Sequence, residues 1–309
     1  MTGLGTTKRD RLDALAATSS EGGVSLARDA FRRLRRNPVA IIGAVIVVAF
    51  LLLALLSPLI APRDPYIRYL IDEIRPGLIP GPRSGFPLGV DQEGRDLLSR
   101  LIVGARQSLI VGVMATLIGL VFGMIIGGAA GAIGGWVDAL LMRFMDVLLS
   151  IPSLLLAISI AAVFRRPNQW TVIVAVAVVS VPIFARLLRG SMLAQRGTDH
   201  VLAARALGVK QNTIVFRHML PNSLSPVIVQ ATLTLAVAII DAAALSFLGL
   251  GDQDVNRAEW GAMLGDSQRF LDVRPELAYY PALCIIVVAL GFTLLGEAMR
   301  EALDPKNRR

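Results

Sequence analysis

The chain has 309 residues, of which 54% are hydrophobic, and its mean hydropathy is +0.63. This apolar content exceeds what a soluble core needs and is typical of a protein that crosses a membrane several times. The formal net charge of +8 does not indicate nucleic-acid binding, because the arginines flank apolar runs instead of lining a polar face. One cysteine excludes a disulfide framework, and two histidines with that cysteine exclude a usual metal cage.

The N-terminal residues 1–37 are predicted to form a cytoplasmic tail and an elbow segment. Residues 1–27 are polar, and five arginines follow between residues 28 and 36. These arginines fit a helix lying on the inner leaflet, and they fit equally a simple charge cluster that sets topology. The first span is expected at about 39–61, which is long enough to cross about 30 Å of hydrocarbon.

A long outer loop and a glycine-striped span are expected next. Residues 63–94 are rich in proline and glycine and show no apolar period, which predicts an unusually long loop outside the membrane. Apolar residues at helical spacing from 97 onward then predict an interfacial helix leading into a span at about 108–131. Gly119, Gly123, Gly127 and Gly131 recur every four residues, so we expect this face to pack closely against another helix.

The third and fourth spans are predicted at about 147–164 and 171–188. Pro152 and Pro182 fall inside them and can kink them where neighbouring helices satisfy the freed carbonyls. Ahead of the third span, Arg143 and Asp146 are three residues apart, which predicts a local salt bridge on one helix face.

A basic loop over 189–224 interrupts the apolar pattern. Thr198 or Asp199 can cap a short helix of about two turns, and Gly208 suits the left-handed residue after it. A second stretch is expected to stop at Pro221. Only one acid lies among the six basic residues in and beside this loop, which places the loop on the cytoplasmic side.

Two further spans, at about 225–248 and 279–297, complete the predicted set of six. Asp241 lies inside the fifth span, where a carboxylate is costly in lipid; it either lines a pathway or pairs with a partner helix. With the N-terminus inside, the inner segments carry 19 lysines and arginines and the outer segments 12. This bias predicts that both termini are cytoplasmic.

Several segments, taken in order, resemble the permeases of ABC importers. Ala203-Ala204, Gly208 and Leu220-Pro221 have the spacing of the family's signature EAA loop. Two positions differ from the family pattern: Leu202 stands where the family has Glu, and His218 stands where the family has Ile. Residues 87–100, PLGVDQEGRDLLSR, and residues 245–251, LSFLGLG, resemble segments of the dipeptide/oligopeptide permease subfamily. The chain is therefore similar to the C-type permease chain of that subfamily.

The resemblance implies an all-α integral membrane protein with the type I ABC-importer permease (MetI-like) fold and an extra N-terminal span. It implies a permease domain over 38–309 that passes di- or oligopeptides into the cytoplasm of a bacterium by alternating access. The coupling residues it implies are Asp199, His200, Val201, Leu202, Ala203, Ala204, Arg205, Ala206, Leu207, Gly208, Leu220 and Pro221. The implied partners are a second permease chain forming a heterodimeric permease, two ABC ATPase domains and an external binding protein, in the inner membrane.

The chain itself is expected to be non-catalytic and to bind no cofactor or metal. Its three lysines follow Thr7, Val209 and Pro305, so none fits a phosphate-binding loop, and ATP with Mg²⁺ is expected on the partner ATPases. Permeases for nickel, glutathione or another small solute remain alternatives to a peptide permease. An intramembrane enzyme and a passive channel are remote alternatives, because both histidines are predicted to lie in the basic loop, far from Ser246.

Overall fold

The computed structural model describes residues 31–254 and 256–303, and all of its named elements are helical. The predicted tail at 1–27 lies outside these residues. The elements are α3 (Pro38–Ile60), η1 (Ile71–Glu73), α4 (Leu97–Ile133), α5 (Gly135–Ser150), α6 (Ser153–Ala162), α7 (Gln169–Gln195), α8 (Asp199–Ala206), α9 (Gln211–Thr213), η2 (Ile214–Met219), α10 (Leu220–Phe247), α11 (Trp260–Ser267), η3 (Gln268–Phe270) and α12 (Glu276–Leu303).

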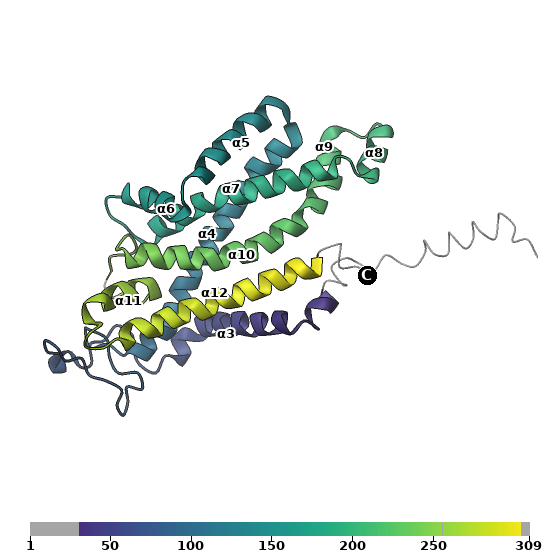
Figure 1. Cartoon of the computed structure of the whole chain (residues 1–309). Coiled ribbons are helices and arrows are strands. Elements are labelled where there is room, and N and C mark those ends of the chain that lie inside the picture. The colour runs from purple at the N-terminus through teal and green to yellow at the C-terminus, as the bar shows by residue number, and fades with distance from the viewer. Residues whose placement is uncertain (1–30, 255, 304–309) are drawn as a thin grey trace, which may run out of the picture.

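The long helices form one bundle with two distinct ends (Figure 1). The short helix α8 lies at one end, with the start of α3 and the end of α12, and α11 lies at the other with the loop after α3. We call these the α8 end and the α11 end. Helix α4 packs along α7, and α12 packs against both α3 and α10.

Five helical segments are long and apolar enough to cross a membrane: α3, α4, α7, α12 and the continuous stretch Gln211–Phe247. The outward face of α3 carries Val45, Leu55 and Leu59, which are exposed apolar side chains of the kind that lipid requires. The fold is therefore that of an all-helical multi-pass membrane protein.

The third predicted span, 147–164, is wrong as a single helix. Helices α5 and α6 meet at an angle of 94° across Ile151 and Pro152, so the sixth span exists only if this bent pair is counted as one. Ile151 is extended, with a ψ of 131°, because the ring of the following proline disfavours helical backbone in the residue before it. By contrast, Pro182 lies inside the unbroken helix α7.

The predicted interfacial helix and second span are one uninterrupted helix, α4. Asp96 caps its start, because its Oδ2 accepts hydrogen bonds from the backbone N–H of Ser99 at 2.9 Å and from the Ser99 hydroxyl at 2.6 Å. Gly134 ends it with a φ of +74°, and α5 begins at the next residue.

The prediction that Pro221 stops a helical stretch is also wrong. Pro221 lies in the first turn of α10, where its missing N–H is tolerated, and the helix continues from Gln211 to Phe247. A π-helical turn, η2, precedes it. Side chains bond to the last carbonyls of this turn: Asn222 Nδ2 donates to His218 O at 2.7 Å and Ser223 Oγ to Met219 O at 2.8 Å. A π-turn of this kind often accompanies a functional site.

Candidate functional site

The short helix α8 lies at one end of the bundle (Figure 1) and comes between α7 and η2 in the chain. Thr198 precedes it, but its hydroxyl donates to Gln195 O at 2.7 Å instead of accepting from the helix start. Gly208 follows it with a φ of +75°, the left-handed conformation that favours glycine. The turn after Leu207 therefore depends on Gly208.

The two sides of α8 have different environments. Val201 and Ala204 are buried against Phe184, Leu188 and Ile214 of the same chain. Asp199, His200, Leu202, Ala203, Arg205, Ala206 and Leu207 are exposed, and Leu207 retains 83% of its accessible surface. Of the two alanines predicted to dock against a partner, only Ala203 is therefore available; Ala204 packs inside the chain.

The structure brings together the only two histidines of the chain, which sequence reasoning treated separately. The ring centroids of His200, on α8, and His218, in η2, are 6.5 Å apart. Ser246 lies at the opposite end of α10 from His218, so neither ring contacts it. Ser246, the hydroxyl considered for an intramembrane enzyme, therefore has no imidazole beside it.

The glycine stripe of α4 contacts α7 of the same chain. A Cβ added at Gly119 would lie 2.9 Å from Ala177 O, and one added at Gly123 would lie 2.8 Å from Val181 O. Gly127 faces the backbone of Ala185, and Gly131 faces Met192. Both helices thus approach at backbone distance, which only glycine permits.

Two ion pairs connect α5 to α7. Arg189 donates from Nε and Nη2 to the carboxylate of Asp138 at 3.0 and 2.6 Å, and Arg186 lies 2.8 Å from Asp146. The predicted local pair between Arg143 and Asp146 is therefore wrong, because Asp146 pairs with a residue of another helix. The two-pronged contact of Arg189 fixes the orientation of α5 on α7 more firmly than a single bond would.

Asp241 lies in the last third of α10 and is half-buried. It makes no ion pair or hydrogen bond with the residues at 31–254 and 256–303. The structure thus gives it no partner helix within the described part of this chain, and both roles predicted for it remain predictions.

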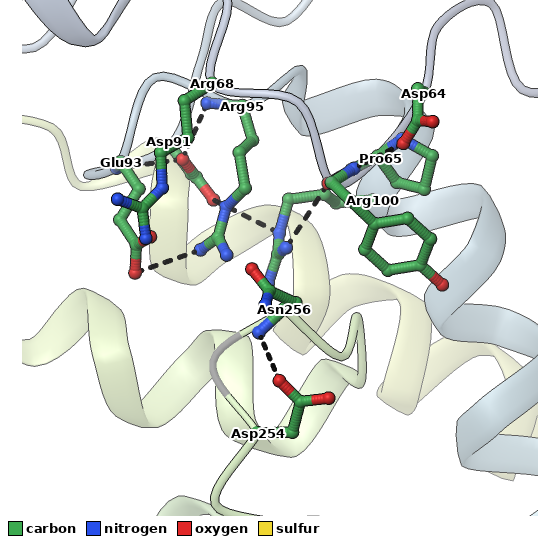
Figure 2. A network of polar contacts seen from close by, with 10 residues as sticks. Asp64, Pro65, Arg68, Asp91, Glu93, Arg95, Arg100, Asp254 and Asn256 are labelled. Carbon is green, nitrogen blue, oxygen red and sulfur yellow. Dashed lines mark hydrogen bonds and ion pairs between the residues drawn. The ribbon is translucent and has the colours of Figure 1, made fainter.

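At the α11 end, a buried ion network holds the start of α4 (Figure 2). Asp91 Oδ2 lies 2.7 Å from Arg95 Nε and 3.1 Å from Arg100 Nε, and both arginines are at most 2% exposed. Arg95 also reaches Glu93, which in turn pairs with Arg68 at 2.5 Å. The segment at 87–100 therefore anchors the loop after α3 onto α4.

A second polar cluster lies where α4, α7, α10 and α11 meet at this end. Arg257 Nη1 lies 2.5 Å from Asp252 Oδ2 and donates to Gln169 Oε1 at 3.1 Å, and Gln169 donates to Gln107 at 3.2 Å. Beside it, the carboxylate of Glu259 caps α11 by accepting from Gly261 N and Ala262 N. Desolvation raises the pKa of Glu259. Sequence reasoning missed this cluster, because its members come from three segments that lie far apart in the chain.

Comparison with known proteins identifies the family. The family described as "Binding-protein-dependent transport system inner membrane component" matches residues 108–309, and "N-terminal TM domain of oligopeptide transport permease C" matches residues 25–77. The chain belongs to the first of these families. It is therefore a membrane permease of the ABC-importer kind, a translocation subunit and not a catalytic one.

Curated relatives cover almost the whole chain. The dipeptide transport system permease protein DppC of Alkalihalophilus pseudofirmus is 43% identical over 92% of this chain and 91% of its own length. The glutathione transport system permease protein GsiD of Pectobacterium atrosepticum is 39% identical over 90% of this chain and 91% of its own length. The GsiD of Shigella sonnei is 42% identical over 89% of both chains.

A solved structure shares the fold. A chain of the MetNI methionine ABC transporter, in an inward-facing form, superimposes with a TM-score of 0.54 at 19% sequence identity. The match covers 66% of this chain and 96% of that one. The predicted MetI-like fold is thereby confirmed, with additional sequence in the present chain.

Proposed function

We propose that this chain is one of two permease chains in an ATP-driven importer that moves di- or oligopeptides into the cytoplasm by alternating access. The observation that carries the substrate class is the 43% identity to DppC over 92% of the chain. Two partner ATPase domains would bind ATP and Mg²⁺, a second permease chain would complete the pathway, and an external protein would deliver the peptide.

The proposal assigns α8 to ATPase coupling. Its exposed surface offers Leu202, Ala203, Ala206 and Leu207, while Val201 and Ala204 fix the helix to α7 and η2 through the core. These apolar side chains lie beside the exposed Asp199, His200 and Arg205, and a short helix with such a mixed surface fits a groove of a partner protein. A helix attached to the bundle passes any displacement to the spans. From the predicted positive-inside bias we infer that the α8 end and both termini lie in the cytoplasm of a bacterium, and that the chain is located in its inner membrane.

Glutathione is a second candidate substrate, because relatives that are 39% and 42% identical are named as glutathione permeases. It is itself a short peptide, so the same pathway chemistry serves both candidates. Uptake of a dipeptide and of glutathione by the same complex distinguishes them.

Reconstitution tests the function. The chain is co-expressed with the permease, ATPases and binding protein encoded beside it, and the complex is placed in liposomes with ATP inside. We expect ATP-dependent uptake of labelled dipeptide, and no ATP hydrolysis by the chain purified alone. ATP hydrolysis by the isolated chain, or a complete complex that does not concentrate peptide, contradicts the proposal.

The coupling role of α8 is tested by comparing its two sides. Ala203→Glu should leave the bundle intact but abolish peptide-stimulated ATP hydrolysis, since an added charge at an exposed position hinders docking. Ala203→Ser, which stays small and neutral, is the matched control and should keep uptake. Ala204→Glu should reduce the amount of folded chain, because this position is only 7% exposed. Full uptake by Ala203→Glu would show that α8 is only a connector.

A further inference from the structure

A cleft of about 390 Å³ opens between the end of α10, the loop after it and α11, at the α11 end of the bundle. This volume is at the lower end of the roughly 300–1,000 Å³ of small-molecule sites, so it suits a ligand of two or three residues and not a long chain. Its walls carry both signs of charge: Asp252, Asp254 and Arg257 from the loop, Asp266 from α11 and Arg269 from η3. The cleft is therefore polar and neither uniformly acidic nor uniformly basic.

Three of these charges, Asp254, Asp266 and Arg269, form no ion pair within residues 31–254 and 256–303. Asp254 accepts a hydrogen bond from Asn256 N at 3.0 Å. Asp252 and Arg257 pair with each other at 2.5 Å. Asp266 and Arg269 are three residues apart, a spacing at which opposite charges meet on a helix, but they do not pair with each other. Neither of their side chains hydrogen-bonds to any other residue in the described part of the chain. Asp266 and Arg269 thus give the cleft one carboxylate and one guanidinium that form neither an ion pair nor a hydrogen bond in the described residues. Asp266 also borders Arg100 of the ion network across a second, smaller cavity.

The cleft also continues into the bundle. Ser246, Asp252 and Arg257 line both this cleft and a narrower cavity, and the narrower cavity reaches Gln107 and Val111 on α4 and Gln169 on α7. Arg257 and Asp252 of the polar cluster thus form part of the wall of both. A ligand in the cleft would therefore lie at the outer end of three membrane-spanning helices.

We propose that this cleft holds the two charged ends of a short peptide before it enters the bundle, with Arg269 facing the carboxylate and Asp266 facing the ammonium group. A free peptide is a zwitterion whose ends are separated by the length of its backbone, and an extended chain spans about 3.3–3.6 Å per residue. An acidic and a basic group that line the same small cleft complement such a ligand. This inference rests on the proposed peptide function and adds a site for the peptide termini.

The test uses the chain paired with its sister permease in lipid nanodiscs, without the binding protein. The probe is an alanyl dipeptide whose second residue is benzoyl-phenylalanine, which links to nearby side chains on illumination. We expect labelled residues within 246–269. Ala-Ala should displace the probe about ten-fold better than N-acetyl-Ala-Ala or Ala-Ala amide, because each blocked peptide loses one charge-assisted contact.

Two variants separate the roles of the charges. Arg269→Gln should abolish the preference for Ala-Ala over its amide and keep the preference over the acetylated peptide. Asp266→Asn should do the reverse. Arg165→Gln and Asp272→Asn change exposed residues that do not line the cleft and are matched controls, which should keep both preferences. Co-purification of the sister permease confirms that each variant is assembled.

Three results would overturn the site: labelling outside 246–269, equal displacement by blocked and free peptides, or preferences that neither variant alters. In a further step the binding protein is added to the labelling reaction. If it displaces the probe from the cleft and free peptides do not, the cleft is a docking surface for that protein instead. If the wild-type complex concentrates peptide while any of these results holds, only the cleft assignment fails. If the complete complex does not concentrate peptide, the proposed function fails first.

Discussion

Replacing Gly127 with alanine is expected to disturb the contact between α4 and α7. The new Cβ would fall onto the carbonyl oxygen of Ala185 and lie 2.8 Å from its Cα, and backbone atoms cannot rotate away as a side chain would. The two helices must therefore separate. Overpacking of this kind costs about 1–3 kcal/mol, whereas alanine gains about 1 kcal/mol over glycine in helix propensity.

The neighbouring Gly128 provides a matched control for this measurement. A Cβ there would meet only Leu188 Cδ2 at 3.8 Å, an ordinary contact, while the gain in helix propensity is the same. The difference in unfolding free energy between Gly127→Ala and Gly128→Ala should therefore equal the packing cost alone, about 1–3 kcal/mol.

The assay is unfolding of the purified chain in mixed micelles with increasing SDS, followed by far-ultraviolet circular dichroism. Gly127→Leu should prevent folding of this chain and therefore its assembly with a second permease. Equal stability of the two alanine variants would refute the reasoning, because it would mean that α4 and α7 are not in backbone contact at this position.

Three further expectations follow from the α11 end and from topology. Asp91→Asn should destabilise the outer loop by about 3–5 kcal/mol, because it leaves two buried arginines without their shared carboxylate. Glu73→Gln, in an exposed pair, should leave the resistance of the loop to cleavage almost unchanged. Limited proteolysis compares the two variants, and equal resistance to cleavage would contradict the network's role. Because desolvation raises the pKa of Glu259, its ionisation in the folded chain costs stability as pH rises from its ordinary value near 4.5 through the folded pKa. Glu259→Gln should flatten this loss in thermal denaturation measured against pH, and an unchanged profile would show that desolvation of this carboxyl is not its cause. In a cysteine-free background, a cysteine at Ser84 should react with impermeant reagent from outside and one at Gln211 only from inside; external reaction at Gln211 would reverse the predicted topology.

The elements that the sequence predicted well are those whose signal is contained in one segment. The first span ends within one residue of the predicted limits, since Pro38 starts α3 and the apolar run stops at Ala61. Gly208 has the predicted left-handed conformation because local steric rules alone decide it.

The failures concern interactions between segments. The hydropathy pattern did not predict the bend at Pro152. Ile151 and Pro152, which separate α5 from α6, are two residues in an apolar stretch, and the average hydropathy over that stretch does not show a change of backbone conformation at two positions. Asp146 has a basic neighbour three residues away, yet it pairs with Arg186, because the packing of α5 on α7 brings that residue closer. The difference between Ala203 and Ala204 likewise depends on what covers α8.

Helix α4 has 37 residues without a break, and at about 1.5 Å per residue it is about 55 Å long, far more than the roughly 30 Å of hydrocarbon. Its first turn is fixed by the ion network, and its last turns are fixed by the backbone contact with α7. A rod held in this way has no internal hinge, so a tilt imposed at its last turn must appear as a displacement of the outer loop. An insertion of two glycines at its midpoint would therefore separate the two ends mechanically while leaving both anchoring contacts in place.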